Sequence, residues 1–246
     1  MSRHLNNNLL AVVDVETTGP IAGVNDLIEI CVMPLGADLT PEKGTLPFQM
    51  ELMPMRRENI DFEAMRIQRK WMERVDSDKI ILSKDAILDA TLKGCEPSRA
   101  ADLFVEWWEN LGLIPFKRIM PIAHNWVFDR SFLIDWLGYK TFDYCFDPRY
   151  RDTMGMSLYD NDIADWRSEY HPYPKNNLAY LASQLKVDRR FSHTALDDCR
   201  VTAEVYRKMV QYTWRPNRRV SVESLEMEQE TLDHTDHTLN DTHPEQ

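Results

Sequence analysis

A short apolar run that ends in acidic residues constrains the fold of this chain more than any other feature. Residues 9–15 read Leu-Leu-Ala-Val-Val-Asp-Val, and Glu16 follows directly. In a β-strand, residues two apart point to the same side, so Asp14 and Glu16 would lie next to each other. Two adjacent anions repel, and a buried pair either shares a proton or binds cations. A solvated strand end followed by a turn at residues 17–19 is the alternative that this stretch alone leaves open.

Further apolar runs at residues 27–35 and 48–53 are bounded by Gly, Pro and Asp, and they predict two more strands. A buried strand is predicted at 119–123. Helices are predicted at 62–75 with Asp61 as N-cap, at 98–111, from Phe128 to a stop at Gly138, at 177–185 and at 195–212. Three strands first, then helices alternating with strands, predict a mixed sheet covered by helices.

The bulk composition is that of an ordinary globular chain. Its 246 residues are 43% hydrophobic, which is enough for one large domain. No apolar run reaches the length of a membrane span, and residues 1–8 lack the layout of a signal peptide. The four cysteines are far apart and form no zinc motif. We therefore expect a cytoplasmic protein with reduced thiols and no membrane contact.

The net charge of −11 is unevenly distributed. From residue 217 onward two arginines stand against eight acidic residues, so about half of the negative charge lies there. Aromatic residues also stop after Pro216. We predict an acidic, disordered tail at 217–246 and a folded domain at 1–216. The remaining acidity does not exclude a polyanionic substrate, because bound cations would offset part of it.

Two later stretches also place acidic residues next to predicted strands or helices. Asp129 falls in the first turn of the helix after the strand at 119–123, where an acid can also serve only as a partner of the helix dipole. His193 comes just before the last predicted helix, and Asp198 lies within it. A metal ligand and a proton acceptor would thus approach the same point.

Together the three stretches resemble, in order and internal spacing, the motifs of the DEDDh family of 3′–5′ exonucleases. This family includes polymerase proofreading subunits, RNase T and oligoribonuclease. Asp-x-Glu-Thr-Thr-Gly stands at 14–19, Asn-x-x-Phe-Asp at 125–129 and His-x-Ala-x-x-Asp at 193–198. The spacing assigns the last acidic role to Asp198 rather than Asp197, and Thr194 stands where a sister branch has Tyr. The resemblance spans about 9–212 and is loose between 51 and 113.

The resemblance implies an α/β, ribonuclease H-like fold with a mixed five-stranded sheet flanked by helices and a helical arm near 55–95. It implies that two Mg²⁺ or Mn²⁺ ions are held by Asp14, Glu16, Asp129 and Asp198. His193 would take the proton from the attacking water. The implied reaction releases nucleoside 5′-monophosphates from the 3′ end of single-stranded DNA or RNA.

The resemblance and the aromatic residues also give candidate substrate contacts. They are Thr17, Thr18, Gly19, Asn125, Trp126 and Phe128. The threonine and glycine residues would offer backbone N–H groups, although a plain turn is the alternative. Trp126 falls off the apolar stripe of its helix, so it is the better candidate for stacking on a base. Phe128 begins that stripe and fits the core better.

The predicted arm helix carries four basic residues, which are Arg66, Arg69, Lys70 and Arg74. Three of them recur every four residues, so they would form one row that either tracks substrate phosphates or pairs with Glu63 and Glu73 on a solvated face.

Two other functions compete with the exonuclease. One is a catalytically silent nucleic-acid-binding or scaffold protein on the same fold, and the other is an endonuclease or recombinase. No catalytic residue is lost, which disfavours the first, and the histidine motif disfavours the second. The expected partners are single-stranded DNA or RNA with a free 3′ end and a polymerase or other replication protein.

Overall fold

The computed structural model describes residues 3–4, 8–66, 72–75, 78–81, 91–112, 118–188 and 194–213. The chain divides into two units, Met1–Val210 and Gln211–Gln246. Only residues 211–213 of the second unit are described, and the fold below is that of the first. The tail predicted at 217–246 lies outside the described residues.

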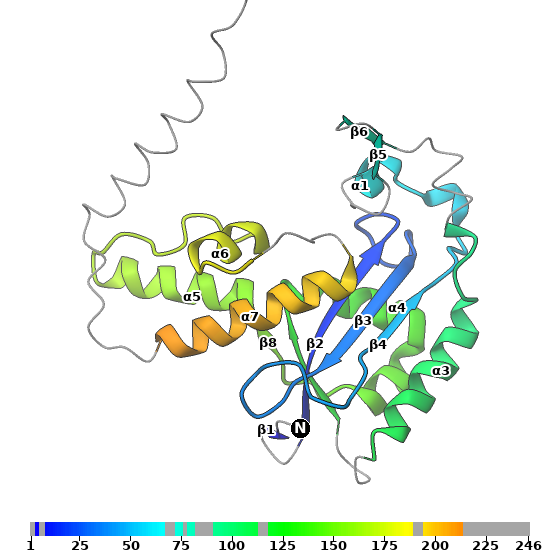
Figure 1. The fold of residues 1–246 in the computed structure, drawn as a ribbon, viewed down its shortest axis with the longest axis horizontal. Helices are drawn as coiled ribbons and strands as arrows, with labels where there is room; N and C mark the ends of the chain where they lie inside the picture. The colour runs from blue at the N-terminus through cyan, green and yellow to red at the C-terminus, as the bar shows by residue number, and fades with distance from the viewer. Residues whose placement is uncertain are drawn as a thin grey trace, which may run out of the picture. The chain divides into compact units, whose positions relative to one another are not determined.

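A mixed sheet forms the centre of the first unit (Figure 1). Its strands lie in the order β4-β3-β2-β7-β8, and a short β1 pairs with β2. Their bounds are β1 Arg3–His4, β2 Asn8–Thr17, β3 Leu27–Pro34, β4 Phe48–Glu51, β7 Ile119–Ala123 and β8 Arg151–Asp152. The pairs β2–β3 and β3–β4 are antiparallel, whereas β2–β7 and β7–β8 are parallel. The predicted mixed sheet is confirmed.

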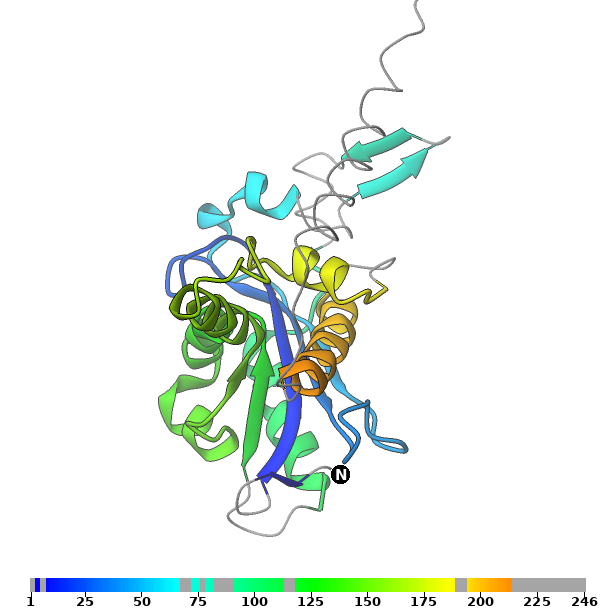
Figure 2. The same cartoon turned by 90° about the vertical axis from the view of Figure 1, so that its left-hand side faces the viewer.

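Helices cover both faces of this sheet (Figures 1 and 2). Their bounds are α1 Phe62–Arg66, α3 Pro97–Asn110, α4 Trp126–Cys145, α5 Thr153–Trp166, α6 Leu178–Gln184 and α7 Ala195–Thr213. Buried side chains of α3 and α4 pack against one face, and those of α7 pack against the other. The sequence analysis did not predict α5, which begins where the side chain of Asp152 accepts from the N–H groups of Met154 and Gly155.

The strand β2 is buried on both faces because helices lie on both sides of it. Leu9, Ala11 and Val13 pack in the cluster that includes α3 and α4, and Leu10 and Val12 pack in the cluster that includes α7. Side chains alternate between the two faces of a sheet. Asp14 and Glu16 continue the series of Leu10 and Val12, so they lie on the side of the sheet that faces α7.

The helix α4 is interrupted at Gly138, which has φ 72° and ψ 149°. The sequence analysis placed the end of the helix at this glycine, whereas the chain resumes helical structure and continues to Cys145. A positive φ costs glycine little. The bend lets Phe142 and Phe146 pack back against Trp126 at the start of the same helix.

The helix predicted for 62–75 is wrong beyond Arg66. Residues Met72–Val75 form strand β5, which pairs with β6 at Asp78–Ile81. Arg74 lies opposite Lys79 on this hairpin, so no single helix carries the basic row. Residues 69 and 70 lie outside the described part. The residue types at 76–78, Asp-Ser-Asp, favour a turn, and the β-branched residues Val75 and Ile80 favour strands. The like charges at 66, 70 and 74 would also destabilise a helix, because they would repel one another at that spacing. The predicted helical arm near 55–95 is therefore wrong for Met72–Val75 and Asp78–Ile81.

Two simpler expectations concern the thiols and the membrane. Cys31, Cys95, Cys145 and Cys199 are free thiols, as the sequence predicts. Among the described helices, none has both the length and the apolar character needed to cross a bilayer.

Candidate metal centre

The strand β2 carries Asp14 and Glu16 beyond the end of its neighbour β7. Val12 is the last residue of β2 that pairs with β7, opposite Ile122. Pairing with β3 continues further, with Glu16 opposite Glu29. Since β7 leads into α4 at this point, the two acidic residues lie at the edge of the sheet where α4 begins.

The first turn of α7 contributes a third acidic residue. Thr194 Oγ1 accepts from the N–H of Asp197 and donates to its carboxylate, and Asp197 also pairs with Arg200. The Thr194 hydroxyl therefore caps the first turn of α7. Asp198 is buried instead, and one carboxylate oxygen of each of Asp14, Glu16 and Asp198 lies within 4.8 Å of the others. Asp197 therefore takes part in the cap of α7, whereas Asp198 faces the pocket.

Asp129 comes to the same place from α4. It is buried, and its Oδ1 accepts from the N–H of Val15 at 3.1 Å, so the helix is joined directly to β2. Together with Asp14, Glu16 and Asp198, it lines a pocket of about 320 Å³. Asp129 is not part of the group of three that lies within 4.8 Å.

The electrostatics of this pocket favour a bound cation. Burial raises the pKa of Asp14 well above its usual value, and the negative charges of Asp129, Asp198 and Glu16 raise this pKa further. Burial also raises the pKa of Asp129, whereas the N–H of Val15 opposes that shift. Carboxylates that repel one another in a buried site are stabilised by divalent cations, and oxygen donors suit Mg²⁺ and Mn²⁺. The residues therefore fit a metal centre.

The start of α4 is held by Asp152 of β8. Its carboxylate accepts from the backbone N–H groups of Asn125 and Trp126, both at 2.9 Å. Asn125 has φ 71°, a left-handed conformation that asparagine tolerates better than most residues. Its backbone N–H is thus used to position α4, and Asn125 is not among the residues that line the pocket.

The sequence analysis missed His124, which lines the pocket with the carboxylates. Its Nδ1 lies 2.9 Å from Thr153 Oγ1, and that hydroxyl also lies 3.3 Å from the carbonyl of Ala123. Its position directly before Asn125 in the second motif was the signal that could have identified it.

The turn after β2 was predicted to contact the substrate, and its residues face different ways. Thr17 and Gly19 line the pocket, and the Thr17 hydroxyl donates to the Gly19 carbonyl at 2.7 Å. Thr18 is fully buried, and its hydroxyl accepts from the N–H of Asp26. A Cβ on residue 19 would lie 2.5 Å from the side chain of Asn25. Close packing by Asn25 thus explains the need for glycine.

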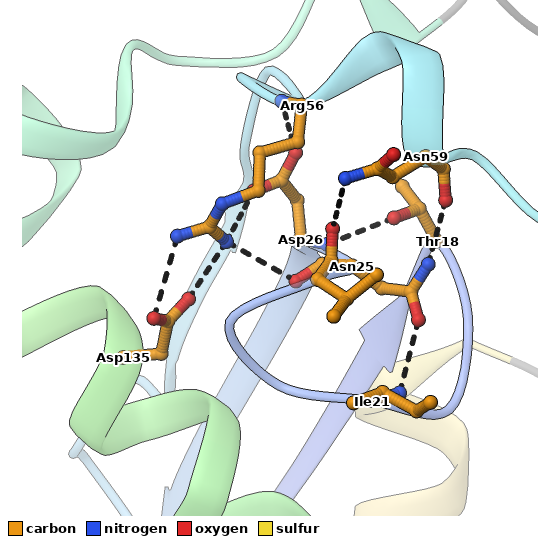
Figure 3. A network of polar contacts seen from close by, with 8 residues as sticks. Thr18, Ile21, Asn25, Asp26, Arg56, Asn59 and Asp135 are labelled. Carbon is orange, nitrogen blue, oxygen red and sulfur yellow. Dashed lines mark hydrogen bonds and ion pairs between the residues drawn. The ribbon is translucent and has the colours of Figure 1, made fainter.

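A polar network fixes this turn from outside the pocket (Figure 3). The Asn25 amide donates to the carbonyl of Asn59 and accepts from the N–H of Ile21. Arg56 pairs with Asp26 at 3.0 Å and with Asp135 of α4 at 2.8 Å. The turn after β2 is therefore tied both to the segment before α1 and to the helix that carries Asp129.

The two aromatic residues predicted to contact the substrate, Trp126 and Phe128, differ in their surroundings. Trp126 has only 2% of its surface exposed, and its ring packs against Phe142 and Phe146. The prediction that its ring stacks on a base is wrong, because the bend at Gly138 returns aromatic side chains over it. Phe128 is partly buried and lines the metal pocket.

His193 lies outside the described residues, so its predicted part in proton transfer stays a prediction.

Comparisons of the sequence find no relative: no protein-family model matches it, and no curated protein matches it. Solved structures do match its fold. The nuclease domain of 3′hExo, described as a DEDDh family member and bound to rAMP, superposes with a TM-score of 0.52 at 16% identity. That match covers 87% of this chain and 98% of the other. The chain has the fold of the DEDDh exonucleases.

Two further structures share the DEDDh fold. S. pombe Pop2p with bound Mg²⁺ and Mn²⁺ matches at a TM-score of 0.56 and 14% identity, over 82% of this chain and 83% of that chain. E. coli exonuclease I in complex with a dT13 oligonucleotide matches at 0.55 and 16%, over 84% of this chain. This chain spans only 41% of the length of exonuclease I. At such identities the likeness concerns the fold.

Proposed function

We propose that this protein is a metal-dependent 3′–5′ exonuclease that releases nucleoside 5′-monophosphates from single-stranded DNA or RNA. One observation carries the proposal: Asp14, Glu16 and Asp198 converge within 4.8 Å in a pocket that Asp129 also lines, on a DEDDh fold. The four residues come from three elements that are far apart in the sequence, β2, α4 and α7. A catalytically silent relative would have no need to keep all four carboxylates.

The four carboxylates would hold two divalent cations. When bound, such cations neutralise charge on the phosphate and help to activate a water molecule. The protein itself supplies a fixed set of oxygen donors, because Asp129 is tied to β2 through Val15 and Asp198 follows a capped turn. Prearranged donors avoid the cost of reorganisation during the reaction.

The chain also supplies groups for the substrate and the proton. His193 is the proposed proton acceptor, because an unperturbed imidazole titrates near neutral pH. Thr17, Gly19 and Phe128 line the pocket, and there they can contact the terminal nucleotide through backbone groups and an aromatic face. Thr18 holds the turn in place, and Asn125 positions α4. No comparison supports a polymerase or replication partner, and we do not propose one.

The test is degradation of matched 5′-labelled DNA and RNA oligonucleotides, single- and double-stranded. We expect a ladder that shortens from the 3′ end in Mg²⁺ or Mn²⁺ and stops in EDTA. Asp14→Asn and Asp198→Asn should each lower turnover by orders of magnitude without unfolding the protein. Asp162→Asn is the matched control, because this exposed acid of α5 lies outside the pocket.

The outcomes separate the possible functions. Full activity in excess EDTA, or in Asp14→Asn, would exclude the metal mechanism. Binding of oligonucleotides without any cleavage would favour the silent nucleic-acid-binding protein. Internal cuts in a circular single strand would favour an endonuclease.

A further inference from the structure

A second pocket opens on α4, outside the metal centre. It has a volume of about 230 Å³, and its lining includes Arg130, Tyr139, Phe142 and Tyr150. Its floor is aromatic and buried: the rings of Phe142 and Phe146 stack at 5.0 Å, next to Trp126. The bend at Gly138 creates this floor, because it returns the second half of α4 against the first.

The rim of this pocket exposes two aromatic rings. Tyr139 is 65% exposed and Tyr150 is 44% exposed. The ring of Tyr150 lies 6.3 Å from that of Trp126, so the exposed rim is continuous with the buried floor. Large aromatic rings around a concave site are typical of surfaces that bind a flat, apolar group.

The charge of the pocket is suited to an anion. Its two acidic residues are already paired, Asp143 with Arg118 and Asp147 with Arg149. Arg130 takes part in no ion pair within the described part of the chain, and its guanidinium lies 5.7 Å from the centre of the Phe142 ring. In a protein with a net charge of −11, this pocket therefore presents an uncompensated cation beside aromatic rings.

The two pockets share the first turn of α4. Val127 lines the second pocket, and the next residue, Phe128, lines the metal pocket. Successive residues of a helix point about 100° apart, so the pockets open on neighbouring sides of a rod about 10 Å across. A few nucleotides of single strand bridge such a distance.

We propose that this second pocket binds one nucleotide of a single strand whose 3′ end lies at the metal centre. The base would lie against Tyr139 and Tyr150, and a phosphate would face Arg130. Stacking on aromatic rings combined with a basic side chain is how single strands are bound without regard to sequence. The identity of the strand rests on the proposed function, whereas the chemistry of the pocket, a base and a phosphate, does not.

The test compares Tyr139→Ala and Arg130→Ala with two controls outside the pocket. The controls are Tyr159→Ala, an exposed tyrosine of α5, and Arg99→Ala, an exposed arginine of α3. Affinity is measured by fluorescence anisotropy in EDTA for a long labelled oligonucleotide and by calorimetry for AMP. Turnover in Mg²⁺ is measured on a dinucleotide, which is too short to reach both pockets, and on the long oligonucleotide.

We expect each pocket variant to weaken binding of the long oligonucleotide about 10-fold, with both controls unchanged. The KM for the long oligonucleotide should rise, whereas kcat and the KM for the dinucleotide should not. Arg130→Ala should lower the slope of log affinity against log salt by roughly 0.7, and Arg130→Lys should retain it.

Unchanged affinity for the long oligonucleotide in both pocket variants would overturn the proposal. If only AMP binding weakened in Tyr139→Ala, the pocket would belong to a free mononucleotide and the strand assignment would be wrong. These results differ from a failure of the proposed function, in which the unaltered protein would cleave neither substrate although binding in EDTA could still be measured.

Discussion

Arg56 Nη1 lies 2.8 Å from Asp135 Oδ2 and 3.0 Å from Asp26 Oδ1, so one guanidinium joins α4 to the turn after β2 (Figure 3). The backbone N–H of Arg56 also donates to Asp26. Asp129 is on the helix and Asp14 is on the strand that these contacts connect. Arg56 is therefore a positioning residue for the metal centre, although it does not line the pocket.

Replacing Arg56 with Ala should lower both stability and turnover. Because Arg56 and Asp135 are partly solvated, we expect the free energy of unfolding to fall by only about 1 kcal/mol and Tm to fall by roughly 2–4 °C. Arg56→Lys keeps the charge but not the forked geometry, so kcat/KM should be restored only in part. Arg57→Ala, at the exposed neighbouring position, is the control. A kcat/KM that changes equally in both alanine variants would contradict the positioning role.

Asp14→Asn should stabilise the protein in the absence of metal. Burial and neighbouring acids raise the pKa of Asp14 in the folded state. The unfolded chain loses this proton near pH 3.9, so the metal-free protein loses stability as the pH rises from there through the folded pKa. In EDTA at neutral pH we expect the variant to have a Tm higher by several degrees, a difference that disappears below about pH 4.

Metal should reverse this order. Mg²⁺ that binds the folded state should raise the Tm of the unaltered protein more than that of Asp14→Asn. Thermal denaturation across pH, with EDTA or Mg²⁺, measures both effects, and Asp162→Asn serves as the control. A variant that is less stable than the unaltered protein in EDTA at pH 7 would show that repulsion does not dominate this site.

Glu29 should position Asp198 through the backbone of α7. The Glu29 side chain is buried on β3, and its Oε1 accepts from the N–H of Ala195 at 3.2 Å, in the first turn of that helix. Glu29→Ala leaves this N–H buried without its acceptor, at a cost of about 1–3 kcal/mol. We expect weaker Mn²⁺ binding by calorimetry and a kcat about 10-fold lower. Glu29→Gln keeps an oxygen acceptor and should retain most of both. Equal losses in the two variants would indicate that the charge matters and the hydrogen bond does not.

His193→Ala should cost about 10²- to 10⁴-fold in turnover if His193 accepts the proton. Mn²⁺ affinity should be largely kept, and the acid limb of the pH–rate profile should change, because the protonated imidazole can no longer limit the rate. His171→Ala is the control, since this exposed histidine pairs with Asp165 at the surface. A normal rate and pH profile in His193→Ala would assign proton transfer elsewhere, and His124 in the metal pocket would be the next residue to replace.

Local patterns of residue types were enough to predict several parts of this protein. The apolar run of β2, the buried strand β7 and the caps of α1 and α6 follow from residue types a few positions apart. The spacing Asp-x-Glu put two carboxylates on one side of β2, and the resemblance of residues 193–198 to the third DEDDh motif singled out Asp198 of α7. The sequence alone indicates these features because the direction of side chains along a strand and the capping of a helix depend on residues only a few positions apart.

Which residues meet across the chain depends instead on long-range packing in the folded protein. A single bend at Gly138 buried Trp126 and created an aromatic pocket, which no helical periodicity predicts, because the covering residues belong to a second helical segment. Glu29 and Arg56 act through partners that are distant in sequence. At Gly138, Glu29 and Arg56, contacts between residues distant in the sequence, rather than local propensity, therefore decide the arrangement.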